Sequence, residues 1–269
     1  MSSKSFLDKV KVALSFSRSA KTYDMFSNLQ KHMAGELVKT VKALKLEPRN
    51  ILDVGTGTGE VAFQLGEHYG HAKIIGCDIA PGMIKASKEK NKTSNITFEV
   101  ADAEDLPYQE GQFDLVVSNA TFQWVEDLFR TFSEAKRVLK KDGFFIFLTF
   151  GPKTLIELSR AYKETINSKA KYLHRYKGLN ETEGLLKDNG FEIINIFSKF
   201  YKQNYADLKT MFRTIKGVGA LNASTELPRG LRGKMKMKSL MEHYKENFSD
   251  AKGIFATYEV IQAVCRKTS

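Results

Sequence analysis

Short apolar runs alternate with amphipathic segments through the middle of the chain, and this alternation predicts the fold. The amphipathic segments repeat apolar residues three and four places apart, as helices do, whereas the runs between them are continuous. Strands are expected at residues 51–54, 72–78, 96–101, 113–118 and 143–150, and helices after residue 60, from residue 81 and over 125–139. This order is typical of a doubly wound α/β protein, in which helices cover both faces of a mostly parallel sheet. Ligands then bind at the edge where the strands end.

Both flanks of this core are mainly helical. Helices are expected over residues 3–15 and 25–44. Between them, a polar hinge at Ser15–Ser19 leads into a loop, Arg18–Asp24, that carries Tyr23. Beyond the core, the pattern predicts helices at 151–168, 181–189 and 205–216, a strand at 191–200, a basic helix, and a last strand at 255–265 that forms a sheet edge.

Composition limits the kind of protein this is. The 269 residues are 42% hydrophobic, and no run approaches the roughly 20 apolar residues of a membrane-spanning helix. Because Cys77 and Cys265 are the only cysteines, we expect neither a disulfide framework nor a zinc site, and we infer a reducing, cytoplasmic location. The net charge of +11 favours an acidic partner, whether nucleic acid, a membrane surface or an acidic carrier protein.

The most informative segment is the turn after the first strand. An apolar run containing Asp53 breaks into three alternate glycines: Gly55, Gly57 and Gly59. Such a turn lets the backbone approach a nucleotide closely. The fingerprint for dinucleotides has its third glycine where this chain has Glu60, which disfavours NAD. The Asp53 carboxylate instead suits a ligand with cationic groups, such as a nucleoside that carries an amino acid. A tight turn without a ligand is the alternative.

Acidic residues also end the second and third strands. Asp78 is placed to accept hydrogen bonds from both hydroxyls of a ribose, unless it only starts the next helix. Asp102 is placed to accept from an adenine amino group, while Ala103 offers its backbone N–H to the ring. The acids that follow, Glu104 and Asp105, are expected to face water.

The fourth strand runs into a polar and aromatic cluster. Asn119 and Gln123 lie beside Trp124, the one tryptophan of the chain, at the carboxyl end of a central strand. Loops at such an edge often carry function, although a tryptophan at a helix start often serves packing alone. No Ser/His/Asp or Cys/His set for nucleophilic catalysis accompanies this cluster.

Four segments together resemble, in order and spacing, class I S-adenosylmethionine-dependent methyltransferases over residues 49–150. They are the Asp53 glycine turn, Asp78, Asp102 and the Asn119 loop. The resemblance implies a seven-stranded, Rossmann-like sheet with an antiparallel last strand. It also implies S-adenosyl-L-methionine as cofactor, no metal, and cofactor contacts from Asp53, Gly55, Gly57, Gly59, Asp78, Ile79, Asp102, Ala103 and Asn119.

Segments outside the core narrow the resemblance to the malonyl-acyl-carrier-protein O-methyltransferases of biotin synthesis, over nearly the whole chain. These segments are Ser17–Asp24 followed by Leu29-Gln30, Asn119-x-x-x-Gln123-Trp124, Arg213–Ala220 and Thr257-Tyr258. The family implies that Tyr23 and Gln30 close over the cofactor. It also implies that Gln123 and Trp124 line the slot for the methyl acceptor.

A substrate carboxylate is part of the same resemblance. The family methylates the free carboxylate of a malonyl thioester, and the product primes pimeloyl synthesis. A carboxylate is already ionised near neutral pH, so no general base is required. Arg213, supported by Lys216, is expected to hold it, because a guanidinium binds a carboxylate in fork geometry.

The resemblance also implies a partner and a layout. An acidic carrier protein is expected to dock on the basic run Arg229, Arg232, Lys234, Lys236 and Lys238. We expect one domain over residues 1–269 and a monomer. The domain comprises a helical lid at 1–45, a cofactor-binding core at 46–150, and cap elements with the last two strands at 151–269, including helical insertions after the fifth and sixth strands.

Other functions stay open at this point. The acceptor of a methyltransferase can be another small molecule, such as a quinone precursor or a small carboxylic acid, or a base of tRNA. The Asn119-Ala120-Thr121-Phe122 segment lacks the Asn-Pro-Pro-Tyr-like pattern expected for a flipped base. A basic nucleic-acid-binding module without enzymatic activity would need a recognition fold or an aromatic platform, and the sequence shows neither.

Overall fold

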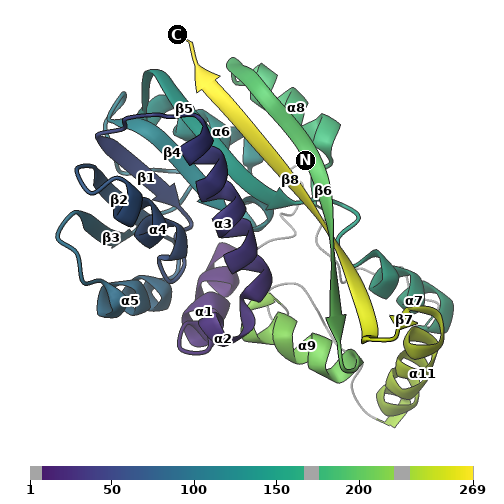
Figure 1. Cartoon of the computed structure of the whole chain (residues 1–269). Coiled ribbons are helices and arrows are strands. Elements are labelled where there is room, and N and C mark those ends of the chain that lie inside the picture. The colour runs from purple at the N-terminus through teal and green to yellow at the C-terminus, as the bar shows by residue number, and fades with distance from the viewer. Residues whose placement is uncertain (1–7, 167–175, 221–230, 269) are drawn as a thin grey trace.

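A mixed sheet forms the centre of the molecule. The computed structural model describes residues 8–166, 176–220 and 231–268 (Figure 1). Its strands are β1 (Asn50–Val54), β2 (Lys73–Asp78), β3 (Ile96–Val100), β4 (Phe113–Asn119), β5 (Leu139–Phe150), β6 (Phe191–Tyr205), β7 (Ser249–Asp250) and β8 (Gly253–Lys267). They lie in the order β3-β2-β1-β4-β5-β8-β6, and the short β7 pairs with β8. β1 to β5 are parallel and β8 is antiparallel to both neighbours, which confirms the predicted α/β class.

The last strand does not form a sheet edge, so that expectation is wrong. β8 lies between β5 and β6, and β6 forms the edge. Every residue of Val260–Cys265 is buried. A strand with successive buried side chains needs cover on both faces, whereas natural edge strands are blunted by charge or shortness. The apolar run at the end of the chain therefore belongs inside the sheet.

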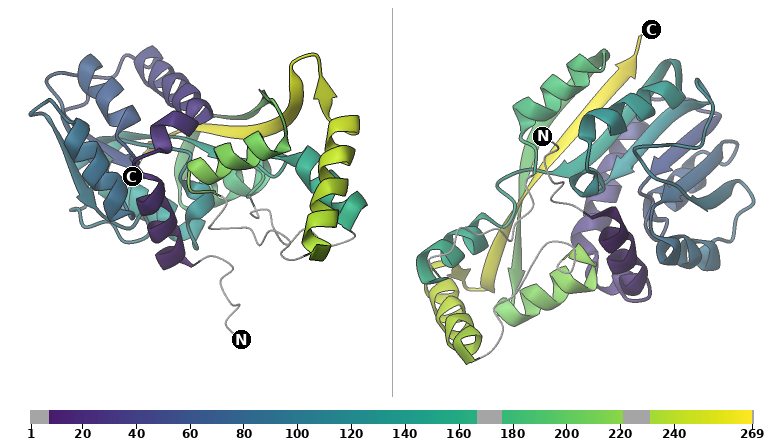
Figure 2. Two further views of the ribbon diagram at one scale, coloured as in Figure 1. Left: turned by 90° about the horizontal axis from the view of Figure 1, so that it is seen from below. Right: turned by 180° about the vertical axis from the view of Figure 1, so that it is seen from behind.

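Helices cover the two faces of the sheet (Figures 1 and 2). They are α1 (Lys9–Ser19), α2 (Tyr23–Phe26), α3 (Asn28–Ala43), α4 (Glu60–His68), α5 (Pro81–Lys90), the 3-10 turn η1 (Phe122–Trp124), α6 (Leu128–Val138), α7 (Ile156–Ile166), α8 (Leu179–Asp188), α9 (Leu208–Gly217) and α11 (Leu231–Asn247). Ile51 of β1 belongs to a buried cluster with Leu37 of α3 and Leu65 of α4. The next residue, Leu52, belongs to a cluster with Phe132 of α6. Successive residues of β1 thus pack against the helices on opposite faces of the sheet.

β6 and β8 extend past β5 and support a separate group of helices. β5 pairs with β8 only from Val260 onward, whereas the β6–β8 pairing continues to Tyr205 opposite Ile254. α7, α9 and α11 pack around this extension (Figure 1). β6 therefore continues beyond Phe200, where the prediction ended it, and the next helix starts only at Leu208.

The N-terminal helices replace the predicted hinge and loop. α1 is continuous through Ser15 and Ser19, and Tyr23 starts α2. Both serines are buried, and the Ser15 hydroxyl donates to the carbonyl oxygen of Gly219 at 2.8 Å. Both serines lie in the interior of the fold, which is why their polarity did not mark a hinge. The predicted start of this helix, residues 3–7, lies outside the described residues.

Three further observations bear on composition. Cys77 and Cys265 are buried free thiols in β2 and β8. In the described part of the chain, no helix combines the length and apolarity needed to cross a membrane. The same residues contain no cluster of His, Cys, Asp and Glu able to hold a metal ion.

Candidate active site

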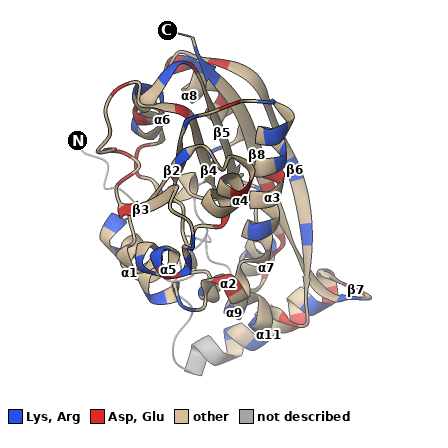
Figure 3. Ribbon diagram, turned by 60° about the vertical axis from the view of Figure 1, so that its left-hand side comes forward, with Lys and Arg blue, Asp and Glu red and all other residues tan. Residues whose placement is uncertain are grey.

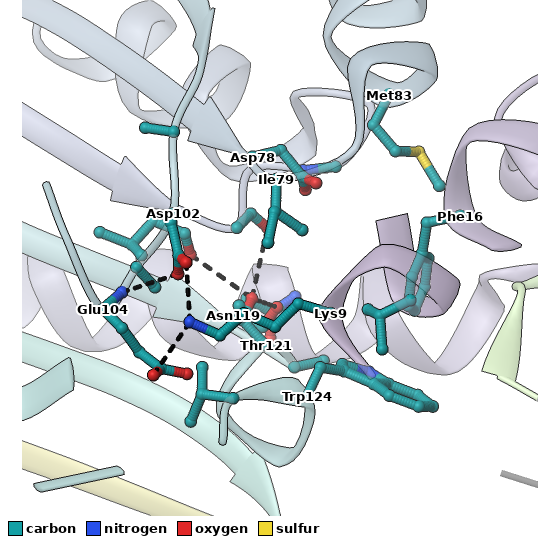
Figure 4. A pocket seen from close by; sticks show the side chains of 18 of the residues that line it. Lys9, Phe16, Asp78, Ile79, Met83, Asp102, Glu104, Asn119, Thr121 and Trp124 are labelled. Carbon is teal, nitrogen blue, oxygen red and sulfur yellow. Dashed lines mark hydrogen bonds and ion pairs between the residues drawn. The ribbon is translucent and has the colours of Figure 1, made fainter. Parts of the chain in front are cut away.

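Three adjoining cavities meet around Tyr23 at the carboxyl edge of the sheet. The first, about 70 Å³, is lined by Asp78 and Asp102 among others (Figure 4). The second, about 70 Å³, lies between η1 and α9 and reaches Tyr258. The third, about 30 Å³, is lined by Asp53. Tyr23 lines all three, and burial raises the pKa of its hydroxyl.

The glycine turn between β1 and α4 forms one wall of the first and third cavities. Gly55 and Gly57 have φ values of +71° and +55°, in the left-handed region that disfavours side chains. A Cβ on Gly55 would lie 2.1 Å from the Thr121 hydroxyl oxygen. A Cβ on Gly57 would have no neighbour within 4 Å, because Gly57 lines the open cavity. Gly59 lines neither cavity and instead precedes the first residue of α4.

Two buried oxygens in the third cavity have no hydrogen-bond partner among the described residues. Asp53 accepts from the Thr56 hydroxyl at 2.6 Å through Oδ2, but its Oδ1 is unpaired. Asn119 donates through Nδ2 to the Gln30 carbonyl oxygen at 2.9 Å, and its Oδ1 is unpaired too. Burial raises the pKa of Asp53 to about 7 against the lowering effect of Thr56. A cationic donor in this cavity would satisfy both oxygens and restore the ionised carboxylate.

Asp78 ends β2 with its carboxylate fixed at both oxygens. Oδ2 accepts from the Gly57 N–H at 3.0 Å and Oδ1 from the Ala80 N–H at 2.8 Å. Burial raises its pKa to about 6. Ala80, not Asp78, is the N-cap of α5, and Asp78 and Ile79 both line the first cavity. The carboxylate is thus held in position and still faces the cavity.

Lys9 of α1 lies against the acids after β3 (Figure 4). Its ammonium is 2.7 Å from Asp102 Oδ2 and 3.0 Å from Glu104 Oε2. Glu104 is buried and also accepts from the Glu126 N–H at 2.6 Å, so the expectation that it faces water is wrong. The compensating cation comes from the N-terminal helix, 93 positions before Asp102, so the sequence around Glu104 does not indicate that this residue is buried. Asp102 and Ala103 line the first cavity as predicted, but Asp102 shares its carboxylate with Lys9.

Trp124 separates the first cavity from the second, because its side chain lines both. Its indole packs edge-on against Phe16 of α1, with ring centroids 5.2 Å apart. Gln123 lines the second cavity, and its amide is fixed by the Ala120 carbonyl oxygen at 2.6 Å and the Thr149 hydroxyl at 3.1 Å. Trp124 therefore lies where the two cavities adjoin, with Gln123 beside it in the second.

Hydroxyl groups that had no assigned role line the far side of the second cavity. The Tyr205 and Tyr258 hydroxyls are hydrogen-bonded to each other at 2.8 Å, and burial raises the pKa of Tyr258. Tyr176 lines the same cavity, as does Gln30. These tyrosines come from β6, β8 and the segment before α8. Only their meeting in space reveals a site, although Tyr258 stands in a segment shared with the resembled family.

The predicted carboxylate anchor does not line these cavities. Arg213 and Lys216 are exposed on α9, while Thr214 and Ile215 face the second cavity. Their role as an anchor stays a prediction. The predicted docking run is only partly described. Lys236 and Lys238 are exposed on α11, whereas Arg229 and the side chains of Arg232 and Lys234 lie outside what the structure describes.

The arrangement fits a sulfonium nucleoside with an amino-acid tail. The third cavity offers unpaired acceptors for an ammonium group, the first offers Asp78 for ribose hydroxyls and Asp102 for an adenine amino group, and the glycine turn leaves room between them. The residues predicted from the strand ends therefore meet around one continuous edge.

Comparison with known proteins agrees with this geometry. A family model described as a methyltransferase domain matches residues 52–147. A methyltransferase structure from Bacillus halodurans C-125 has a TM-score of 0.62 at 20% identity, covering 87% of this chain and 100% of that one. The YcgJ protein from Bacillus subtilis has a TM-score of 0.61 at 18% identity, covering 88% and 99%. These two similarities show the fold.

Sequence relatives show the family. A malonyl-[acyl-carrier protein] O-methyltransferase from Geobacter sulfurreducens is 38% identical over 97% of this chain and 100% of its own length. One from Gallionella capsiferriformans is 34% identical over 95% of this chain and 89% of its own. Because both similarities run through the core, the N-terminal helices and the cap, the chain belongs to the malonyl-[acyl-carrier protein] O-methyltransferase family.

Proposed function

We propose that this protein transfers a methyl group from S-adenosyl-L-methionine to the free carboxylate of a malonyl thioester carried by acyl carrier protein. The methyl ester would prime pimeloyl synthesis for biotin. One observation supports this most directly: a second cavity lined by hydroxyls adjoins the cavity that fits the nucleoside, and the two share Tyr23 and Trp124. The names of the full-length relatives supply the substrate class.

The chain binds and orients the cofactor in this proposal. Asp53 and Asn119 would hold the ammonium group, with the backbone of Gly55 and Gly57 beside the tail. Asp78 would accept from the ribose hydroxyls. The remaining cofactor contacts would be Tyr23, Gln30, Ile79, Asp102 and Ala103, whereas Gly59, which lines neither the first nor the third cavity, would only shape the turn. When bound, the cofactor supplies a methyl group on a sulfonium, ready for in-line displacement.

The acceptor residues act by positioning and by excluding water. A malonyl carboxylate is ionised near neutral pH, so the chain needs no general base to activate it. The Tyr205 hydroxyl already donates to Gln203, so we infer that the Tyr258 hydroxyl turns from Tyr205 to donate to the carboxylate or the thioester carbonyl. Gln123 and Trp124 would line the path to the methyl group. Removing water from the carboxylate raises its reactivity, because its charge disappears as the ester forms.

A direct contact between Arg213 and the carboxylate is a separate proposal. It requires this side chain, with Lys216, to turn from solvent into the second cavity when substrate binds. The Arg213→Gln variant tests it with malonyl-CoA, a small thioester without carrier protein. A loss of kcat/KM for this substrate, matching the loss for the carrier-bound one, would support the anchor.

Methyl transfer by the purified protein tests the function. Malonyl-acyl-carrier protein, malonyl-CoA, a quinone precursor and tRNA are each incubated with labelled S-adenosylmethionine, and calorimetry measures cofactor binding. We expect labelled methyl ester from the malonyl thioesters only. Asp78→Ala serves as a negative control in the same assay. Transfer to the quinone precursor or to tRNA, without transfer to a malonyl thioester, would contradict the proposal.

A further inference from the structure

α9 carries an exposed basic stripe, which we define as Lys209, Arg213 and Lys216. Their spacing of four and three positions places them on one face of the helix. All three side chains are exposed, and none has a hydrogen-bond or ion-pair partner within the described ranges. Other exposed lysines, such as Lys177 and Lys187, pair with glutamates four positions away in or beside α8.

The charge of the stripe is only partly compensated. The sequence of α9 contains no acidic residue. The nearest acid along the chain is Asp207, whose pKa is lowered mainly by the hydrogen bond from the Thr210 N–H at 2.7 Å and also by the charges of Lys209 and Arg213. One carboxylate therefore faces three cations, and like charges on one helix face repel each other. This excess of positive charge marks a surface suited to an anionic molecule.

The other face of α9 is a wall of the second cavity. Thr214, Ile215 and Val218 line that cavity and lie on the side of the helix away from the stripe. α9 also contacts α2 and α11, so it lies between the N-terminal helices and the cap (Figures 2 and 3). One helix thus separates a basic outer surface from the acceptor cavity.

We propose that the basic stripe of α9 docks the acidic carrier protein that presents the thioester. The inference rests on the proposed function. It gives Lys209, Arg213 and Lys216 an outward role, which for Arg213 and Lys216 is the alternative to the inward turn that the carboxylate anchor requires. The carrier stays outside, and its thioester arm passes around α9 into the second cavity. The exposed Lys236 of the neighbouring α11 lies on a helix that packs against α9, so the docking surface can continue there.

Lys209→Glu tests the stripe with least disturbance to the site. Lys209 lies in the first turn of α9, where glutamate is favourable for the helix, so the variant is expected to fold. The matched control is Lys141→Glu, the same charge change at an exposed position near the amino end of β5, which is the end of the parallel strands opposite the cavities.

We expect Lys209→Glu to raise KM for malonyl-acyl-carrier protein about three- to tenfold, with kcat nearly unchanged. KM for malonyl-CoA should change less than twofold. Raising ionic strength should increase the wild-type KM for the carrier substrate more than that of the variant, because exposed charges are screened by salt. Lys141→Glu should behave like the wild type in every assay.

Several outcomes would overturn the docking surface. Equal effects on carrier and coenzyme A substrates, or equal effects of both lysine variants, would remove it while leaving the methyltransferase function intact. Weaker retention of tRNA or anionic vesicles by Lys209→Glu, with unchanged carrier kinetics, would assign the stripe to another partner. If the wild type methylates neither thioester, calorimetry with malonyl-acyl-carrier protein still tests docking, and equal affinities for wild type and Lys209→Glu would refute it.

Discussion

The two sides of the site are built in different ways. The first and third cavities depend mainly on residues that follow β1 to β4, and these residues lie between Asp53 and Trp124 in the chain. The second cavity combines α2, α3, η1, α9, β6 and β8. Buried carboxylates dominate the cofactor side, whereas tyrosine hydroxyls dominate the acceptor side. In the proposed function, the sheet edge would hold the cofactor, and a cap assembled from distant segments would select what receives the methyl group.

Removing charge on the cofactor side should produce the largest effect. In Asp78→Asn, both ribose hydroxyls lose a charged acceptor, and we expect cofactor affinity to fall about 30-fold by calorimetry. The control is Asp105→Asn, which changes an exposed acid in the next loop and should leave the affinity unchanged. A wild-type affinity for Asp78→Asn would mean that Asp78 only supports the glycine turn.

Removing a hydroxyl on the acceptor side should weaken the reaction with the methyl acceptor and leave cofactor binding unchanged. In Tyr258→Phe, we expect kcat/KM for malonyl thioester to fall about tenfold, while the cofactor dissociation constant stays constant. Tyr205 keeps a hydrogen bond to Gln203 at 2.8 Å, so the fold should lose little stability.

Tyr244→Phe is the matched control for this second change. Its hydroxyl donates to the Phe255 carbonyl oxygen at 2.8 Å in the core, and it does not line the second cavity. Its removal should lower the free energy of unfolding by about 1 kcal/mol without changing kcat/KM. Equal kinetic losses in both variants would show that the tyrosines act through stability alone.

A smaller effect is expected when pH is lowered, and it should change the affinity for the cofactor only. Burial raises the pKa of Asp78 to about 6 in the ligand-free protein, and the ribose hydroxyls need its ionised form. As pH falls from 7.5 to 5.5, protonation should weaken cofactor binding about fourfold more in the wild type than in Asp78→Asn. Calorimetry across this range checks the difference. Parallel pH profiles would assign the titration to another group, such as Asp53.

The position of the cofactor-side residues was largely predictable because each of them lies at or just after the carboxyl end of a strand. Asp53, Asp78 and Asp102 each follow a strand, and parallel strands bring their carboxyl ends to one edge. The glycines identify the turn in the sequence, and the structure places Gly55 and Gly57 in the left-handed region. The exception is Glu104, whose burial depends on Lys9 in the distant α1.

The acceptor side was predictable only through family resemblance, and its geometry differed from the expectation. Arg213 has the same sequence context whether it faces inward or outward, and only the packing of α9 turns it to solvent. The Tyr205–Tyr258 pair depends on the register of β6 against β8, which a single strand does not encode. Tyr258 stands in a segment shared with the family, but no neighbour of Tyr205 in the chain marks it as part of a site.

Local pattern was sufficient for the α/β class, the parallel core and the glycine turn that receives the cofactor, because each depends on residues close together in sequence. Tertiary structure decided three other features. It placed β8 inside the sheet, where a fully buried strand has neighbours on both sides. It brought Lys9 to the acids of the first cavity. It also made α9 a wall with a basic outer face, because long-range packing alone determines which side of a helix meets solvent.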